Sequence, residues 1–233
     1  MSSGEIIHTA AGPCRVHRSD RRTLAISVLP DGSVELSSPL DATHRVLREK
    51  VRHRLRWIAT QRRKFADLNQ ARTPLRYVSG ATHRYLGRQY RLKIQTGSNP
   101  GVRLIEGRFH IIVAERIETA VESSLAAWYR TKAIEQFTRR LAGWKSWCRE
   151  HRLPEPKLRL LRMPKRWGSS QRDGTIRLNP HLVKAPAACI DYVVAHEICH
   201  LSHPYHDRSF FRLLDQLCPN WRTLKHHLES ADI

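Results

Sequence analysis

Residues 192–200 read Tyr-Val-Val-Ala-His-Glu-Ile-Cys-His, which places His196, Glu197 and His200 in the spacing His-Glu-x-x-His. On an α-helix, residues four positions apart share one face and lie about 6 Å apart along the axis, so two imidazoles can bind one metal ion. The apolar residues before His196 favour burial of this helix. The pattern is typical of helices in which two neutral imidazoles bind Zn²⁺ and the glutamate accepts a proton from the metal's water.

The stretch after this helix offers two candidates for a third ligand, His203 and His206. His203 would stay on the same helical stripe, but its Cα would then lie about 10 Å along the axis from His196. Pro204 disfavours helical geometry at His203 and permits a turn that returns His206 to the metal. We therefore predict His206 as the third ligand and place His203 behind the ligands or at the rim of the site.

The predicted site leaves a fourth position on the metal open for water, with Glu197 as general base and not as a ligand. Chance spacing is a competing explanation, because the chain contains 14 histidines. The glutamate in the correct position, the apolar lead-in, the third histidine and the intervening proline count against chance. A degenerate site that has lost its metal or its activity is the other alternative. The predicted site therefore consists of Zn²⁺, the ligands His196, His200 and His206, and the catalytic residue Glu197.

The chain is strongly basic, with 41 Lys and Arg against 21 Asp and Glu and a net charge of +20 over 233 residues. Residues 190–233 contain four basic and six acidic side chains, a balance of −2, which leaves +22 for residues 1–189. This asymmetry favours an anionic partner or substrate, with nucleic acid or nucleotide phosphates as the first candidates. The alternative is that the arginines simply cover solvated faces.

The five cysteines form no Cys-x-x-Cys pair and their number is odd, which favours reduced thiols in a cytoplasmic protein. No signal peptide and no membrane-spanning run is evident, so we expect a soluble protein without a membrane partner. The sequence carries no indication of an oligomeric state.

Alternation of apolar and polar residues predicts strands in the first half of the chain. The first three predicted strands, with a turn at 30–33, suggest a small antiparallel meander, and the later ones suggest another antiparallel unit with a hairpin about Glu106-Gly107. Between these groups, apolar positions from Val46 to Phe65 recur at helical spacing. We therefore expect a basic, β-rich region over residues 1–115 with one amphipathic helix. The predicted strands are 14–18, 24–29 and 34–36, followed by the stretch 84–94 with a turn at Gly87 and the hairpin of 102–113.

The second half predicts a domain over residues 116–233 that is richer in helix. Thr119 and Glu122 have the spacing of a capping box, which opens a long helix ending near Glu150. Strands at 158–162 and 175–178 precede the metal helix, which Pro186 opens in its first turn. Asp207 is predicted to cap the next helix, which Pro219 stops, and an amphipathic stretch closes the chain. The fold class is α+β, with the metal helix beside a small antiparallel sheet.

With these motifs placed, the chain resembles the YgjP-like metallopeptidases, relatives of the SprT and WLM groups of zincins. The resemblance implies a zincin-like domain in which the three histidines bind zinc and Glu197 is the catalytic acid and base. It also implies a three-stranded sheet beside the metal helix, with residues 166–169 on a strand near the cleft, where an extended peptide could add as a further strand. The matching stretches are 166–169, 176–179, 191–200, 203–206 and 210–211.

These observations favour a zinc-dependent metallohydrolase, first of all a metallopeptidase acting on a peptide or protein. The resemblance also includes a member assigned as a pyrophosphatase acting on UTP, so a metal-dependent nucleoside triphosphate pyrophosphatase is an alternative. A third possibility is a nucleic-acid-associated module with a structural zinc, which would bind through the basic N-terminal half. One departure is Ser170, where family members commonly have Cys; we expect the metal triad to be indifferent to it.

Overall fold

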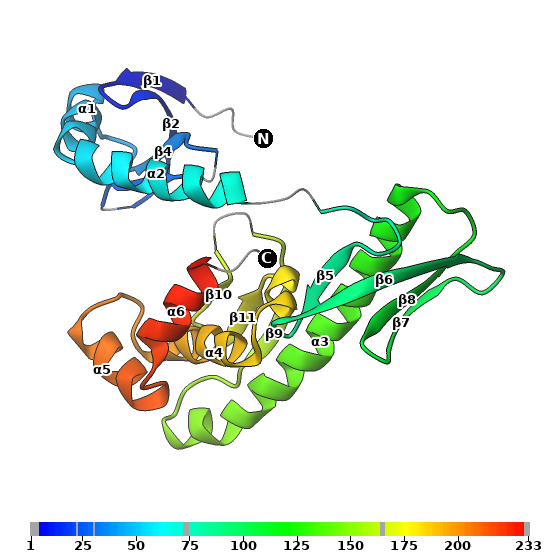
Figure 1. Cartoon of the computed structure of the whole chain (residues 1–233). Helices are drawn as coiled ribbons and strands as arrows, with labels where there is room; N and C mark the ends of the chain where they lie inside the picture. Colours follow the sequence, from blue (N-terminus) through cyan, green and yellow to red (C-terminus); the bar gives the residue numbers. More distant parts are fainter. Residues whose placement is uncertain (1–4, 22, 30, 72–74, 164–165, 231–233) are drawn as a thin grey trace. The chain divides into compact units, whose positions relative to one another are not determined.

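The computed structural model in Figure 1 describes the backbone of residues 5–21, 23–29, 31–71, 75–163 and 166–230. The side chains of residues 64, 65 and 67–71 lie outside this description. The chain forms two compact units, residues 1–73 and residues 74–233. It is an α+β protein in which antiparallel strand pairs predominate. The boundary predicted at 115/116 falls inside the second unit.

The first unit contains a four-stranded sheet in the order β1-β2-β4-β3. Its strands are β1 (Glu5–Thr9), β2 (Gly12–Arg18), β3 (Ala25–Val28) and β4 (Val34–Ser38). The predicted meander is wrong in one respect, because β4 lies between β2 and β3 and pairs in parallel with β2. β3 and β4 form an antiparallel hairpin, and the other side of β4 pairs with β2. Strand β1 is an addition to the predicted strands.

Two helices cover this sheet where the sequence predicts one. Helix α1 (His44–His53) and helix α2 (Leu55–Ala71) are separated at Arg54, whose backbone angles of −110° and 8° are not helical. Leu47, Val51 and Ile58 from the helices are buried against the strands. The side chain of Phe65, the last predicted apolar position, lies outside the described residues.

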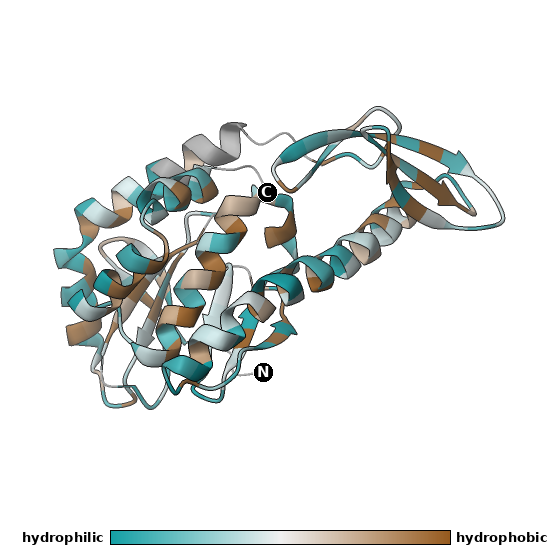
Figure 2. Ribbon diagram, turned by 90° about the horizontal axis from the view of Figure 1, so that it is seen from below, coloured by the Kyte–Doolittle hydropathy of each residue, from teal (hydrophilic) through white to brown (hydrophobic). Residues whose placement is uncertain are grey.

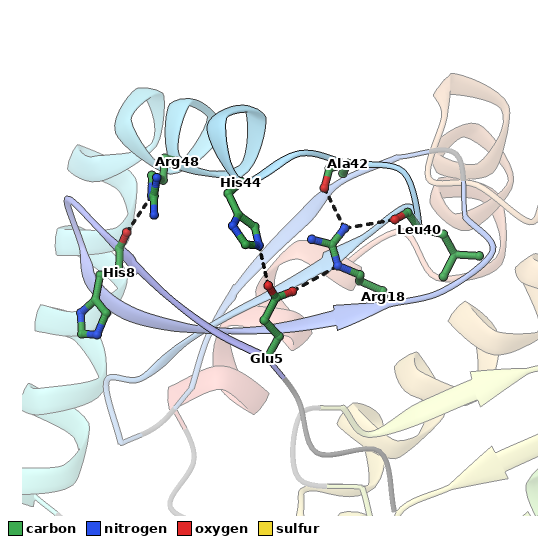
Figure 3. Close-up of polar contacts among 7 residues, drawn as sticks. All are labelled: Glu5, His8, Arg18, Leu40, Ala42, His44 and Arg48. Carbon is green, nitrogen blue, oxygen red and sulfur yellow. Dashed lines mark hydrogen bonds and ion pairs between the residues drawn. The ribbon is translucent and has the colours of Figure 1, made fainter.

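Polar contacts attach the edge strand β1 to the rest of the first unit (Figure 3). The Glu5 carboxylate accepts hydrogen bonds from Arg18 Nε at 3.2 Å and from His44 at the start of α1. Both contacts lower the pKa of Glu5, and the hydrogen bond with His44 has the larger effect. Arg48 Nε donates to the His8 carbonyl at 3.1 Å. These contacts join β1 both to its neighbouring strand and to α1.

The second unit begins with a four-stranded sheet in the order β5-β6-β8-β7. Its strands are β5 (Thr82–Tyr85), β6 (Arg88–Thr96), β7 (Gly101–Ile105) and β8 (Arg108–Val113). The predicted hairpin is confirmed, since Glu106 and Gly107 have φ of 48° and 72° and so form a tight turn. The predicted fully antiparallel unit is wrong, because β6 and β8 pair in parallel. Hydrophilic and hydrophobic residues alternate along this sheet, seen at the upper right of Figure 2.

Helix α3 (Glu118–Glu150) joins this sheet to the rest of the second unit. Near its start, Trp128 and Tyr129 pack edge-to-face against the buried Phe109 of β8. Further along, Arg140 Nε donates a hydrogen bond of 2.7 Å to Asp191 Oδ1, which lies on the helix that carries His196 and His200. The single helix therefore contacts both the sheet and the helix that carries the site.

The predicted capping box at Thr119 is wrong, although the predicted end of the helix near Glu150 is confirmed. The helix begins at Glu118, and its N-cap, Ile117, makes no side-chain capping hydrogen bond. Thr119 is already inside the helix, where its hydroxyl is not placed to cap the first free amides.

A three-stranded sheet in the order β10-β11-β9 lies beside the helices that follow (Figure 1). β10 and β11 are antiparallel, whereas β11 and β9 are parallel. Pro186 is the N-cap of α4, one position earlier than predicted, and Asp207 caps α5 as predicted, accepting from Phe210 N at 2.9 Å. None of the helices in the described residues is long and apolar enough to cross a membrane. The elements are β9 (Lys157–Leu160), β10 (Gly168–Ser170), β11 (Thr175–Leu178), the 3-10 helix η1 (Pro180–Lys184), α4 (Ala187–Ser202), α5 (Arg208–Leu217) and α6 (Trp221–Ser230).

The turn between β5 and β6 docks directly on the segment that leads into α4. Gly87 has φ of +81°, and a Cβ at this position would lie 2.9 Å from Pro186 Cα. Its amide donates to the Lys184 carbonyl at 3.0 Å. A glycine is therefore required both by the backbone conformation and by the close approach.

We predict that Gly87→Ala lowers the free energy of unfolding by roughly 2–4 kcal/mol, as the sum of left-handed strain and overlap with Pro186. Gly80→Ala is the matched control, because Gly80 has φ of +89° but a Cβ added there would have no atom within 4 Å. The control should lose only about 1–2 kcal/mol. Urea unfolding of both variants checks this, and equal losses would show that the contact with Pro186 is unimportant.

Candidate metal centre

Helix α4 and the loop after it bring three imidazoles together. His196 and His200 lie on one face of α4, with ring centroids 4.9 Å apart. His206 comes from the short loop between α4 and α5, and its ring centroid lies 4.6 Å from that of His200. One ligand nitrogen from each of the three residues lies within 4.8 Å of the others. The structure thus brings together the three residues that the sequence predicts as ligands.

His203 occupies a different place from these three histidines. Helix α4 ends at Ser202, and the backbone of His203 is extended. Its carbonyl accepts a hydrogen bond from His200 Nδ1 at 3.0 Å, which leaves His200 Nε2 available to a metal. The Nδ1 atom of the His203 ring lies 3.2 Å from the hydroxyl oxygen Oγ of Ser209. His203 thus orients a candidate ligand from behind.

Phe210 is a residue of the site whose role is missed in the sequence, where it is an apolar helix position within one of the stretches that carry the family resemblance. Its ring is fully buried and lies 5.0, 4.6 and 4.7 Å, centroid to centroid, from the rings of His196, His200 and His206. It therefore packs against all three imidazoles at once. Helical periodicity predicts that Phe210 is buried but not what it is buried against.

The environment keeps the three histidines in the neutral form that binds metals. Burial first, and then the charges of the neighbouring His200 and His206, lower the pKa of His196 to about 3. Burial also lowers the pKa of His200 and of His206. At neutral pH each ring therefore has an unprotonated nitrogen available.

The geometry of these side chains fits a bound divalent metal. His206 Nε2 and His196 Nε2 are 3.1 Å apart, close to the separation of about 3.3 Å expected for two nitrogens on one tetrahedral zinc ion. Beside these nitrogens, the buried carboxylate oxygen Glu197 Oε2 has no hydrogen-bond partner within the described part of the chain. An unpaired buried polar atom beside converging imidazoles is expected at a site that is completed by a ligand.

Glu197 is buried beside the triad, with 5% of its surface exposed. Burial raises its pKa to about 7, while a hydrogen bond from the Ser170 side chain and the charge of Arg166 act in the opposite direction. Ser170, the position that departs from the common family pattern, is thus a direct neighbour of the predicted general base.

Gly168 on β10 lies in close contact with Glu197. A Cβ on Gly168 would lie 2.6 Å from Glu197 Oε1 and 2.8 Å from its Cγ. Strand β10 can therefore approach the carboxylate this closely only with glycine at this position. Gly168 belongs to one of the stretches that carry the family resemblance, but its place in the sequence gives no indication of this contact.

A pocket of about 470 Å³ opens over the site within the second unit. One wall is formed by residues 166–172, which include β10, and the other by α4, the loop after it and α6. Beyond the predicted site residues, the walls include Arg166, Arg172, Tyr192, Lys225, Leu228 and Glu229.

Comparison with protein families agrees with this geometry. The family model for the YgjP-like metallopeptidase domain matches residues 22–231. The chain belongs to the YgjP-like family. It is accordingly a hydrolase of the metallopeptidase type, and the family implies a divalent metal, for which the three histidines are a suitable site. No curated protein matches the chain significantly.

The choice between His206 and His203 as third ligand is open to direct measurement in this YgjP-like protein. We predict that His206→Ala lowers zinc affinity by at least tenfold, because it removes one of three nitrogens. His203→Ala keeps the carbonyl that supports His200 and should change affinity far less. Competition with a chromogenic zinc chelator measures both constants. The assignment is wrong if the His203 variant shows the larger loss.

The contact between Gly168 and Glu197 makes a second prediction. Gly168→Ala must displace the carboxylate, so hydrolytic activity should fall by about tenfold or more while the three histidines still bind metal. Gly101→Ala is the control, because Gly101 also lies in a strand and has no atom within 4 Å of its potential Cβ. Activity and bound metal are measured on both purified variants, and full activity of Gly168→Ala would contradict the argument.

Proposed function

We propose that this protein is a zinc-dependent metallopeptidase in which Glu197 is the general base. The observation that supports this most strongly is the buried Glu197 carboxylate, whose Oε2 has no partner among the described residues, beside three converging imidazoles in one pocket. A carboxylate in this position costs stability unless it meets a polar group, and an attacking water supplies one.

A metal bound by the three histidines supplies Lewis acidity and lowers the pKa of water. In the proposed reaction Glu197 takes a proton from the attacking water and delivers it to the nitrogen of the leaving amine. The close contact with Gly168 restricts the carboxylate to a narrow range of positions. His203 and Phe210 orient the ligand rings, so the histidines do not have to reorganise during the reaction.

Zinc is the proposed metal because of the donor set. Imidazole nitrogen suits zinc, whereas calcium and magnesium prefer oxygen ligands. Three protein ligands with an open position are typical of catalytic zinc sites, and four protein ligands are typical of structural ones. A group of three imidazoles beside a pocket therefore favours catalysis over a structural zinc.

The free edge of β10 supports a peptide substrate. In the β10-β11-β9 sheet, β10 is an edge strand that pairs only with β11 among the strands that the structure describes. Its residues line the same pocket as Glu197 and the histidines. An extended peptide that added to this edge would gain main-chain hydrogen bonds and run past the metal.

Hydrolysis of a nucleoside triphosphate is the second candidate. The pocket wall carries three cationic side chains, Arg166, Arg172 and Lys225, which suit a phosphate chain. Both reactions would use the same water and the same general base. The candidates therefore differ in the substrate and not in the proposed machinery.

We predict that Glu197→Gln lowers the rate of hydrolysis by about 10²–10⁴-fold, since the amide cannot accept the proton. Bound zinc should be unchanged, because Glu197 is not a proposed ligand. The experiment is a screen of peptides and nucleoside triphosphates, including UTP, with zinc content measured in parallel. Turnover that the variant retains in full would exclude Glu197 as the base, and turnover of nucleotides alone would replace the peptidase by the second candidate.

A further inference from the structure

The sheet of the second unit has two chemically different faces. Burial alternates along β6 and β8, so Leu92, Ile94, Phe109 and Ile111 point into the core. The residues between them point away from α3, on a face that we call the outer face of the β5–β8 sheet. Its twelve positions are Thr82, Arg84, Gln89, Arg91, Lys93, Gln95, Gly101, Arg103, Ile105, Arg108, His110 and Ile112.

The strand register gathers four of the five Lys and Arg residues of this outer face into two rows, and the fifth, Arg84, lies opposite Gln89. Arg91 of β6 is opposite Arg108 of β8. Lys93 is opposite His110, which is in turn opposite Arg103 of β7. Neighbouring strands lie about 4.8 Å apart and alternate residues along a strand about 6.7 Å apart, so the cations form a compact grid.

The cations of this grid are not balanced within the sheet. The outer face contains no acidic residue, and Arg91, Lys93, Arg103 and Arg108 are all exposed. Among the residues described, none of these four makes an ion pair; the nearest acid in sequence, Glu106, lies in the hairpin turn. Like charges directly opposite on a sheet destabilise it. Such an arrangement is explained if a polyanion neutralises it.

We propose that the outer face of the β5–β8 sheet binds the phosphate backbone of duplex nucleic acid. Three of the four exposed cations are arginines, whose planar donors match phosphate oxygens, and a grid of cations suits a partner with regularly repeated charges. The first unit of the same chain is not a suitable occupant of this surface, because it is itself basic. It has 14 Lys and Arg against seven Asp and Glu over residues 1–73.

Two features of the outer face select the duplex among polyanions. Single-stranded nucleic acid is normally bound by aromatic side chains on which bases stack, and the outer face has no Phe, Tyr or Trp among its twelve residues. Attachment to a membrane surface generally adds inserted apolar or aromatic side chains to the basic ones, and here the only exposed large apolar residue among the twelve is Ile105. Contacts with phosphates alone predict binding without sequence preference.

The test measures binding of a short fluorescent duplex DNA of arbitrary sequence, by anisotropy, between about 50 and 200 mM salt. The test variant replaces Arg91, Lys93, Arg103 and Arg108 by Gln. The control likewise replaces four cations by Gln, so it removes the same amount of charge as the test variant. Its four positions, Arg130, Arg149, Arg159 and Arg208, are exposed and lie outside this face. We expect the slope of log affinity against log salt to become shallower by about 3–4 in the test variant, with at least tenfold weaker binding at low salt. The control should keep most of the affinity.

Thermal unfolding verifies that each variant is folded. If the fourfold variant is not, the pairs R91Q/R108Q and K93Q/R103Q take its place, each with about half of the change in slope. Equal losses in test and control variants, or no binding of duplex by the unaltered protein at low salt, would overturn the proposal. Tighter binding to single-stranded DNA, or to vesicles of equal parts phosphatidylserine and phosphatidylcholine, would also overturn it. Glu197→Gln should bind duplex normally, so this test is independent of the proposed hydrolysis.

Discussion

The structure of the second unit depends on burying helix α4 while leaving three of its polar side chains able to react. Ile190, Val194, Ile198 and Cys199 are fully buried, so the helix is enclosed on most sides. Burial keeps His196 and His200 neutral and raises the pKa of Glu197 to about 7. The same packing that stabilises the core therefore prepares the site, because both a metal ligand and a general base require these protonation properties.

Close backbone approach is the second constraint on the site. Gly87 permits the β5–β6 turn to meet the segment before α4, and Gly168 permits β10 to meet Glu197. In both places a side chain would overlap with the neighbouring element. Strand β10 is also an edge strand. Gly168, which restricts the Glu197 carboxylate, therefore lies on a strand whose backbone can still pair with a further strand. The wall of the pocket can in this way position the base and receive an extended substrate.

Chemistry and charge are distributed unevenly over the second unit. The pocket combines neutral imidazoles with a few cations on its walls, whereas the outer face of the β5–β8 sheet carries a grid of cations without acids. Helix α3 contacts both regions, through Phe109 at the sheet and Asp191 at the metal helix. A ligand on the outer face and a substrate in the pocket would thus be held by one continuous core.

Local sequence patterns predict the helix that carries the site, the spacing of His196 and His200, and the return of the chain to His206 after Pro204. These features are local, because helical periodicity and the restriction before proline act within a few residues. The packing of distant segments establishes which strands are neighbours, and it places Gly168 against Glu197 and Phe210 against all three imidazoles. It also brings Arg91 and Arg108 side by side. Each of these depends on contacts between residues far apart in the chain. Local alternation predicts which positions are buried, but it carries no information on their partners.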